Sequence, residues 1–118
     1  MNKTCHLLLT IFIILTAADF SEARPEKIKP GLSYFSEDYI TKNNVSDISD
    51  EKNYEEVFKN YEYYEAVYDE LKRVKIFRAY KRGEVILKEK YFYAPNGKLA
   101  KKEVTDSKNK LKTITFGK

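Results

Sequence analysis

Five acidic residues lie close together near the middle of the chain and could do chemistry without histidine. Two carboxylates can act as acid and base in glycoside hydrolysis, and the candidates are Glu55, Glu56, Glu62, Glu65 and Asp69. Nothing in their spacing selects one pair, and the short stretch that carries them offers little cleft for a sugar. The sequence therefore assigns no catalytic residue, and we expect the chain not to be an enzyme.

Tyrosines interleaved with lysines form a second group that could bind a ligand. Aromatic rings beside cations can stack sugars or unpaired bases. The residues concerned are Tyr54, Tyr61, Tyr63, Tyr64, Tyr68, Tyr80, Tyr91 and Tyr93. Such tyrosines more often cover a small β core while their hydroxyl groups stay in contact with water. We favour core packing and cross-strand pairing, and we expect no specific nucleic-acid binding.

The first residues of the chain predict export. Lys3 precedes an apolar run over residues 7–18, which has the length of a signal-peptide core and is shorter than the roughly 20 residues of a membrane span. Ser21 and Ala23 place small residues at positions −3 and −1 of a cleavage site, and residues 16–18 offer a second site. We expect residues 1–23 to be a signal peptide cleaved after Ala23, with an uncleaved anchor or a core helix as the alternative. The mature chain would then be secreted or periplasmic and carry no transmembrane helix.

Cleavage would also change the chemistry of the chain. Cys5 and His6 are the only cysteine and histidine of the chain, and both would be removed with the signal peptide. The chain also has no tryptophan. Disulfides, cysteine and histidine nucleophiles, and zinc, copper or haem sites that use these ligands are then excluded. A phosphate-cradling glycine loop is absent as well. We expect no cofactor-binding and no metal-binding residue.

The charge of the chain allows an electrostatic function. The formal net charge is +4, and about +5 without residues 1–23. A basic exported protein could bind anionic lipid or cell-surface polymer, although most of its lysines alternate with acidic residues, as on a solvated face. Five lysines near the C-terminus could either hold a polyanion or protect a strand edge: Lys101, Lys102, Lys108, Lys110 and Lys112.

Two segments with different sequence patterns follow the predicted signal peptide. Residues 24–52 contain Pro25, Pro30 and Gly31 and few apolar residues, so we predict an extended linker in which residues 32–35 could dock. Residues 44–46 form a glycosylation sequon, which matters only in a eukaryotic source. Residues 53–118 carry the regular pattern of a small β-meander domain.

Within that domain, residues 53–71 combine helical spacing with aromatic residues that favour strands. We predict a short helix over residues 50–59, capped by Ser49 or Asp50, and then a strand from Tyr61.

Turn signals then recur, and the strongest is Asn96-Gly97. Taking Lys72, Gly83, Gly97 and Asn109 as equivalent turn positions, further strands lie over residues 74–80, 85–93, 99–105 and 111–116. The predicted class is mainly β, an antiparallel meander of about five short strands with one short N-terminal helix, and α+β is the alternative. Apolar residues on both faces predict either bulges or a thin sheet that is partly wet on both sides.

Three stretches share one pattern: residues 68–74, 93–99 and 105–111. Each begins with an aromatic residue or Thr, often followed by Asp, and ends with Gly or a substitute, a basic residue and an apolar one. This pattern resembles the tandem hairpin modules of YD repeats and MORN-variant repeats over about residues 61–116. Gly97 is the only glycine at the expected position, and Ala94 replaces one Asp. The resemblance implies a β architecture with a binding or structural role, and it carries over no catalytic residue.

These observations predict an exported small binding or interaction module whose partner is another protein. The alternative is an electrostatic binder of anionic cell-surface polymer or lipid. Salt separates the two, because screening weakens the second mode most.

Overall fold

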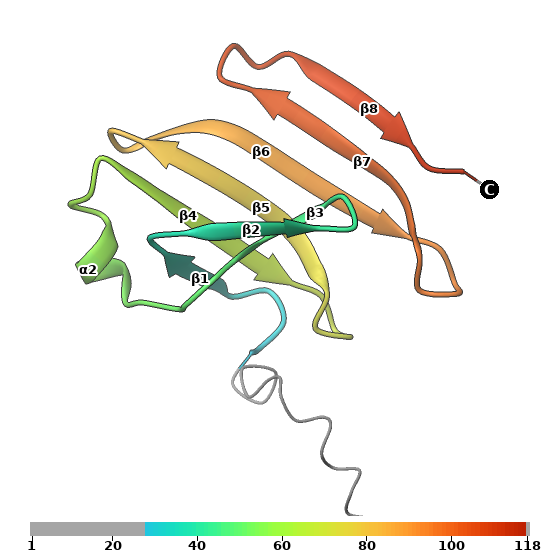
Figure 1. Ribbon diagram of the computed structural model, residues 1–118, viewed down its shortest axis with the longest axis horizontal. Helices are drawn as coiled ribbons and strands as arrows, with labels where there is room; N and C mark the ends of the chain where they lie inside the picture. The colour runs from blue at the N-terminus through green and yellow to red at the C-terminus, as the bar shows by residue number, and fades with distance from the viewer. Residues whose placement is uncertain (1–27, 118) are drawn as a thin grey trace, which may run out of the picture.

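The computed structural model describes residues 28–117 and shows a mainly β fold (Figure 1). Five strands follow one another in the sequence and pair in order: β4 (Glu62–Tyr68), β5 (Val74–Lys81), β6 (Glu84–Tyr93), β7 (Leu99–Asp106) and β8 (Leu111–Thr115). All neighbours are antiparallel. The predicted five-stranded meander is therefore confirmed, and its strand bounds differ from the predicted ones by at most about one residue. The predicted signal peptide lies outside the described residues.

The predicted linker is corrected over residues 33–48, which form three strands. β1 (Ser33–Ser36) pairs with β4 and becomes the sixth strand of the sheet, so the segment predicted to dock does so by strand pairing. β2 (Tyr39–Lys42) and β3 (Val45–Ile48) form a separate hairpin. Each strand has only four residues, and all of β2 is exposed. A signal this short has too few alternations to be recognised in the sequence.

The single short helix of the described residues, α2 (Tyr54–Val57), is smaller than predicted. Asn53, and not Ser49 or Asp50, caps it, and the Glu56 carboxylate accepts a hydrogen bond from the Asn53 amide at 3.1 Å. Val57 is fully buried, which explains why so short a helix is held in place. The segment after the helix is strand β4, so the aromatic residues there follow their β preference.

All four predicted turn positions adopt positive φ: Lys72 at 67°, Gly83 at 80°, Gly97 at 90° and Asn109 at 64°. In three of the turns this residue donates its amide to the carbonyl oxygen three residues earlier, at 2.8–3.0 Å: Lys72 to Asp69, Gly97 to Ala94 and Asn109 to Asp106. The carboxylates of Asp69 and Asp106 each also accept two backbone amides. The shared turn pattern of the sequence therefore corresponds to one shared backbone geometry.

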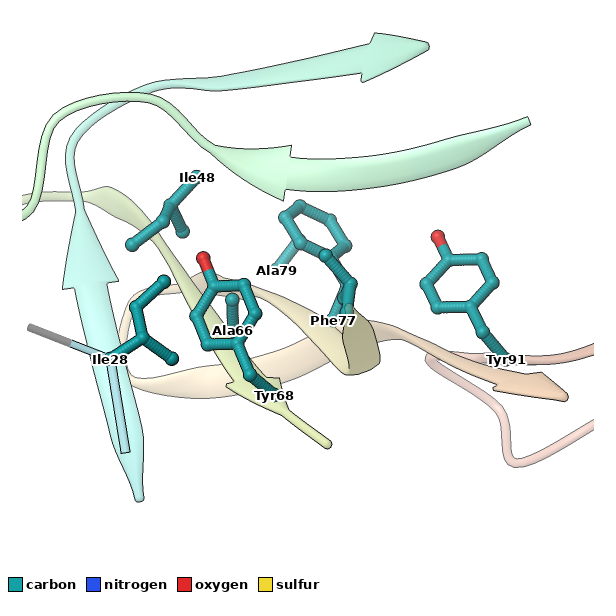
Figure 2. Packing of buried hydrophobic residues seen from close by; sticks show 8 residues of the cluster. Ile28, Ile48, Ala66, Tyr68, Phe77, Ala79 and Tyr91 are labelled. Carbon is teal, nitrogen blue, oxygen red and sulfur yellow. The ribbon is translucent and has the colours of Figure 1, made fainter. Parts of the chain in front are cut away.

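The sheet has two unlike faces, and three bulges shift its register. The β2–β3 hairpin covers one face, here called the hairpin face, chiefly over β4 and β5 (Figure 1). Figure 2 shows Ile28 and Ile48 beside side chains of the sheet, and the buried cluster is Ile28, Ile48, Ala66, Tyr68, Val74, Phe77, Ala79 and Tyr91. The opposite face, the helix face, carries ring contacts of Tyr54 with Phe35 and Tyr63. Neither covering element is long enough to shield a whole face, and the β7–β8 half stays open.

Candidate functional site

A buried hydrogen-bond chain fixes the hairpin on the sheet. The Tyr91 hydroxyl accepts a hydrogen bond from the Ser46 amide at 2.9 Å and donates one to the Glu89 carboxylate. Tyr91 is 4% exposed and Glu89 is 9% exposed, and the hydroxyl points toward the hairpin in Figure 2. Burial, followed by the bond to Glu89, raises the pKa of Tyr91 well above its usual value, so the phenol stays neutral.

Two further bonds hold β3 and the turn before it. The Tyr68 hydroxyl donates to the Asp47 carboxylate at 2.5 Å. At the hairpin turn, the Lys102 ammonium group of β7 donates to the Asn44 carbonyl oxygen at 3.1 Å and lies 4.0 Å from the Glu89 carboxylate. The hairpin position is thus specified by polar groups of three sheet strands.

An open cleft of about 750 Å³ lies between the hairpin and the ends of β5, β6 and β7. Its apolar residues come from both layers: Ile40, Val45, Val74, Tyr93, Leu99 and Phe116. Two lysines, Lys42 and Lys98, also line it. Ligand sites are commonly concave, mostly apolar and of about 300–1,000 Å³, so this cleft has the form of a small-ligand site.

Two polar side chains of the cleft lining, Tyr93 and Asp47, are already engaged in hydrogen bonds within the protein. The Tyr93 hydroxyl donates to the Val74 carbonyl oxygen at 2.7 Å, and burial raises the pKa of Tyr93 to about 12. The Asp47 carboxylate accepts hydrogen bonds from the Ile48 amide and the Tyr68 hydroxyl. Within residues 28–117, Lys42 and Lys98 form no ion pair. The cleft therefore offers apolar walls and positive charge.

β8 is the second feature that can bind a partner. It ends the sheet order, so no described strand pairs with its outer side. The Asp106 amide donates to the Lys110 carbonyl oxygen, and the Phe116 amide donates to the Ala100 carbonyl oxygen. Hydrogen-bonded pairs alternate in an antiparallel ladder, so Leu111, Thr113 and Thr115 direct their backbone amide and carbonyl groups away from β7.

The carboxylates considered for catalysis are dispersed. Glu55 and Glu56 lie in the first turn of α2, Glu62 is half-exposed 3.8 Å from the Lys81 ammonium group, and Asp69 organises a turn. Burial raises the pKa of Asp69, but hydrogen bonds from Arg73 and Leu71 outweigh burial and leave the pKa below its usual value.

Glu65 is the buried member of this set, at 5% exposure. Its carboxylate accepts hydrogen bonds from the Ser33 hydroxyl, the Tyr80 hydroxyl at 2.6 Å and the Arg78 guanidinium at 2.9 Å. Burial raises the pKa of Glu65, but these three donors outweigh burial and hold it below its usual value. A general acid needs a raised pKa, so Glu65 has the properties of a structural anion.

Most of the predicted tyrosine cluster packs as expected. Tyr63 stacks on Tyr80 with ring centroids 4.7 Å apart, and Tyr64 stacks on Phe77 at 6.0 Å. Tyr68, Tyr91 and Tyr93 bond through their hydroxyl groups as described above. Tyr54 and Tyr61 are exposed, and Tyr61 lies near the cations of Lys81 and Arg82 at 5.7 and 5.9 Å.

The five C-terminal lysines fall into three groups, and Lys101 lies 4.8 Å from the centre of the Phe92 ring and 3.9 Å from the Glu103 carboxylate. Lys102 is turned toward the hairpin, as its bond to Asn44 shows, and so it does not protect an edge. Lys108, Lys110 and Lys112 lie exposed in the last turn and in β8. Among residues 28–117, no three His, Cys, Asp or Glu side chains are grouped as metal ligands, and no helix there could span a bilayer.

Sequence comparison assigns most of this architecture to one family. The model of the "Family of unknown function (DUF6156)" matches residues 44–118. The chain belongs to this family. No curated protein and no solved structure matches it.

The region that matches DUF6156 starts at the hairpin turn and includes β3, α2 and β4–β8. It contains the β8 edge and the sheet side of the cleft, whereas Ile40 and Lys42 precede it. Sequence reasoning missed the cleft because these two residues lay in the predicted linker. One signal could have found the hairpin: Asn43 and Asn44, both at positive φ, stand between two short runs as in a tight two-residue turn.

Proposed function

We propose that the chain is an exported binding module without catalytic activity, which captures an extended segment of another protein along β8. Export rests on residues 1–23 as a signal peptide cleaved after Ala23. N-terminal sequencing of the protein recovered outside the cytoplasm tests this part, and a chain that still begins at Met1 there would refute it.

The observation that carries the binding proposal is the free outer side of β8. Three residues, Leu111, Thr113 and Thr115, present amide and carbonyl groups that no described strand uses. An extended peptide can add a strand to such an edge, with backbone hydrogen bonds supplying affinity and neighbouring side chains supplying specificity. The open half of the hairpin face lies beside this edge, where Ile114 and Phe116 are half-buried.

Charge on and beside β8 favours an acidic partner segment. Lys108, Lys110 and Lys112 are exposed, and lysines on an edge strand repel an identical strand. The same lysines would attract carboxylates on a different chain. They therefore support a hetero-partner over a second copy of this protein.

A proline at position 113 tests the edge. The Thr113 amide points away from β7, so Thr113→Pro removes one outward donor and leaves the β7–β8 hydrogen bonds in place, as proline permits on an edge strand. Thr113→Val is the matched control, because it keeps the amide. The probes are two extended peptides, one alternating valine with glutamate and the other alternating valine with lysine.

We expect the acidic peptide to shift the NMR signals of the Leu111, Thr113 and Thr115 amides, and Thr113→Pro to weaken binding by about tenfold relative to Thr113→Val. Equal binding of both peptides, or of both variants, would refute the proposal. A dimer of the protein that dissociates on Thr113→Pro would place a second copy on this edge and would also refute it.

An observation on the helix face supports an electrostatic alternative. The register Arg78–Lys88 and Phe92–Lys101 places these side chains on one face with Lys90. The cations of Lys90 and Lys101 lie 6.0 and 4.8 Å from the Phe92 ring. Such a face could bind anionic polymer or lipid, and attachment to phosphatidylglycerol vesicles that does not weaken with added salt would contradict this function.

A further inference from the structure

We infer that the cleft under the β2–β3 hairpin is a binding site for a small amphipathic anion, an apolar chain or ring that ends in a carboxylate. This inference is independent of the strand-capture proposal, because strand capture rests on the backbone groups of Leu111, Thr113 and Thr115, and none of these three residues lines the cleft.

The first argument is that the walls suit an apolar body. Ile40 and Val45 on the hairpin oppose Tyr93, Leu99 and Phe116 on the sheet side. Ile40 is 55% exposed, although it lies beside the cleft. An apolar ligand between the two layers would remove this surface from water, with a gain of about 25 cal/mol for each Å² of apolar area.

The second argument is the sign of the available charge. Among the described residues of the cleft lining, only Asp47 carries a carboxylate, and this carboxylate already accepts two hydrogen bonds from the protein. The two lining lysines, Lys42 and Lys98, are exposed and form no ion pair with any residue in the range 28–117. A ligand with a negative end therefore finds cations to pair with, whereas a cationic ligand finds no uncommitted carboxylate among the described residues of the lining.

The third argument is that the cleft is built before any ligand arrives. Three hydrogen bonds tie the hairpin to the sheet. The Ser46 amide donates to the Tyr91 hydroxyl, the Lys102 ammonium group donates to the Asn44 carbonyl oxygen, and the Tyr68 hydroxyl donates to the Asp47 carboxylate. A hairpin fixed in this way cannot close onto the sheet without breaking these hydrogen bonds, of which the Ser46–Tyr91 bond is buried. Preorganisation of this kind lowers the cost of binding.

The test uses two probes with the same twelve-carbon chain and opposite charge, dodecanoate and dodecyltrimethylammonium. Each is titrated below its micelle concentration into the purified protein, and binding is followed by NMR at the cleft residues and by calorimetry. We expect dodecanoate to bind, with shifts centred on Val45, Leu99 and Phe116, and to bind at least about tenfold more tightly than the cationic probe.

Charge reversal then tests the two lysines. The double variant Lys42→Glu/Lys98→Glu should weaken dodecanoate binding by about tenfold or more. The control variant Lys108→Glu/Lys110→Glu changes the net charge of the protein by the same amount, but outside the cleft, and should change the dodecanoate affinity less than about twofold. All four side chains are exposed, so we expect both variants to fold, and equal urea midpoints would show it.

Equal affinity for the two probes, equal effects of the two charge reversals, or no saturable binding up to about 1 mM would each refute the inference. Thr113→Pro should leave dodecanoate binding unchanged. Loss of peptide capture in that variant together with intact dodecanoate binding would separate the fate of this site from that of the β8 edge.

Discussion

The Tyr91 hydroxyl is the group whose removal should most clearly loosen the hairpin. Tyr91→Phe keeps the ring and deletes one oxygen, which leaves the buried Ser46 amide without its partner and removes one donor from the Glu89 carboxylate. An unsatisfied buried amide costs about 1–3 kcal/mol, and a hydrogen bond to a charged group contributes about 1.5–3 kcal/mol. Lys102 stays 4.0 Å from Glu89 and offsets part of the loss, so we expect the free energy of unfolding to fall by about 3 kcal/mol.

Two measurements follow this change. Urea unfolding gives the loss of stability, and amide hydrogen exchange reports on the hairpin itself, because the Ser46 amide should exchange faster once it opens to water. Tyr93→Phe is the matched control: its hydroxyl donates to one carbonyl oxygen, that of Val74, and its loss should cost only about 1 kcal/mol. Unchanged exchange at Ser46, or equal destabilisation by the two variants, would refute the assignment of the hairpin's position to this hydrogen-bond chain.

Two further predictions concern the helix face and the turns. Glu65→Gln should lower the free energy of unfolding by about 2 kcal/mol at neutral pH, whereas Glu62→Gln, at an exposed site on the same strand, should change it by less than about 0.5 kcal/mol. Because hydrogen bonds hold the folded pKa of Glu65 below its usual value, the unfolded chain takes up the proton first as the pH falls. Glu65 therefore contributes its full stabilisation above about pH 4.5, and this stabilisation is lost as the pH falls through the folded pKa. The free energy of unfolding should depend less steeply on pH in the acid range in Glu65→Gln. An unchanged slope would contradict the ionised role of Glu65. Gly97→Ala should cost about 1 kcal/mol in thermal unfolding, since φ is 90° although no atom lies within 4 Å of an added Cβ; a neutral effect would mean that the turn relaxes to another conformation.

The β4–β8 meander could be predicted because its signals are local. Asn96-Gly97 and the Asp-led turns fix where each hairpin reverses, through positive φ and carboxylate-to-amide bonds within four residues. The strands between them are long enough to show β preference even where the bulges after Val67, Ala79 and Phe92 break the alternation. The helix was predicted in the right region but too long, because Asn53 caps it in place of Ser49 or Asp50 and Lys52 forms a bridge with Phe35 of β1.

The candidate site was hidden for the opposite reason. Ile40 and Lys42 belong to a four-residue strand that is exposed throughout, and the cleft beside it exists only because Tyr91 and Lys102, more than forty residues later, hold the hairpin in place. Glu65 was one of five equivalent carboxylates until β5 placed Arg78 and Tyr80 around it.

The sequence by itself determined the β class, the positions of the turns and the order of the last five strands, because turn chemistry and strand length act over a few neighbouring residues. Only the tertiary structure decided which face each strand buries, that residues 33–48 join the fold, that no described strand pairs with the outer side of β8, and that the hairpin and the sheet form an apolar cleft with two lysines in its lining. These features depend on hydrogen bonds and packing between segments far apart in the chain, and no local pattern of residues encodes such pairings.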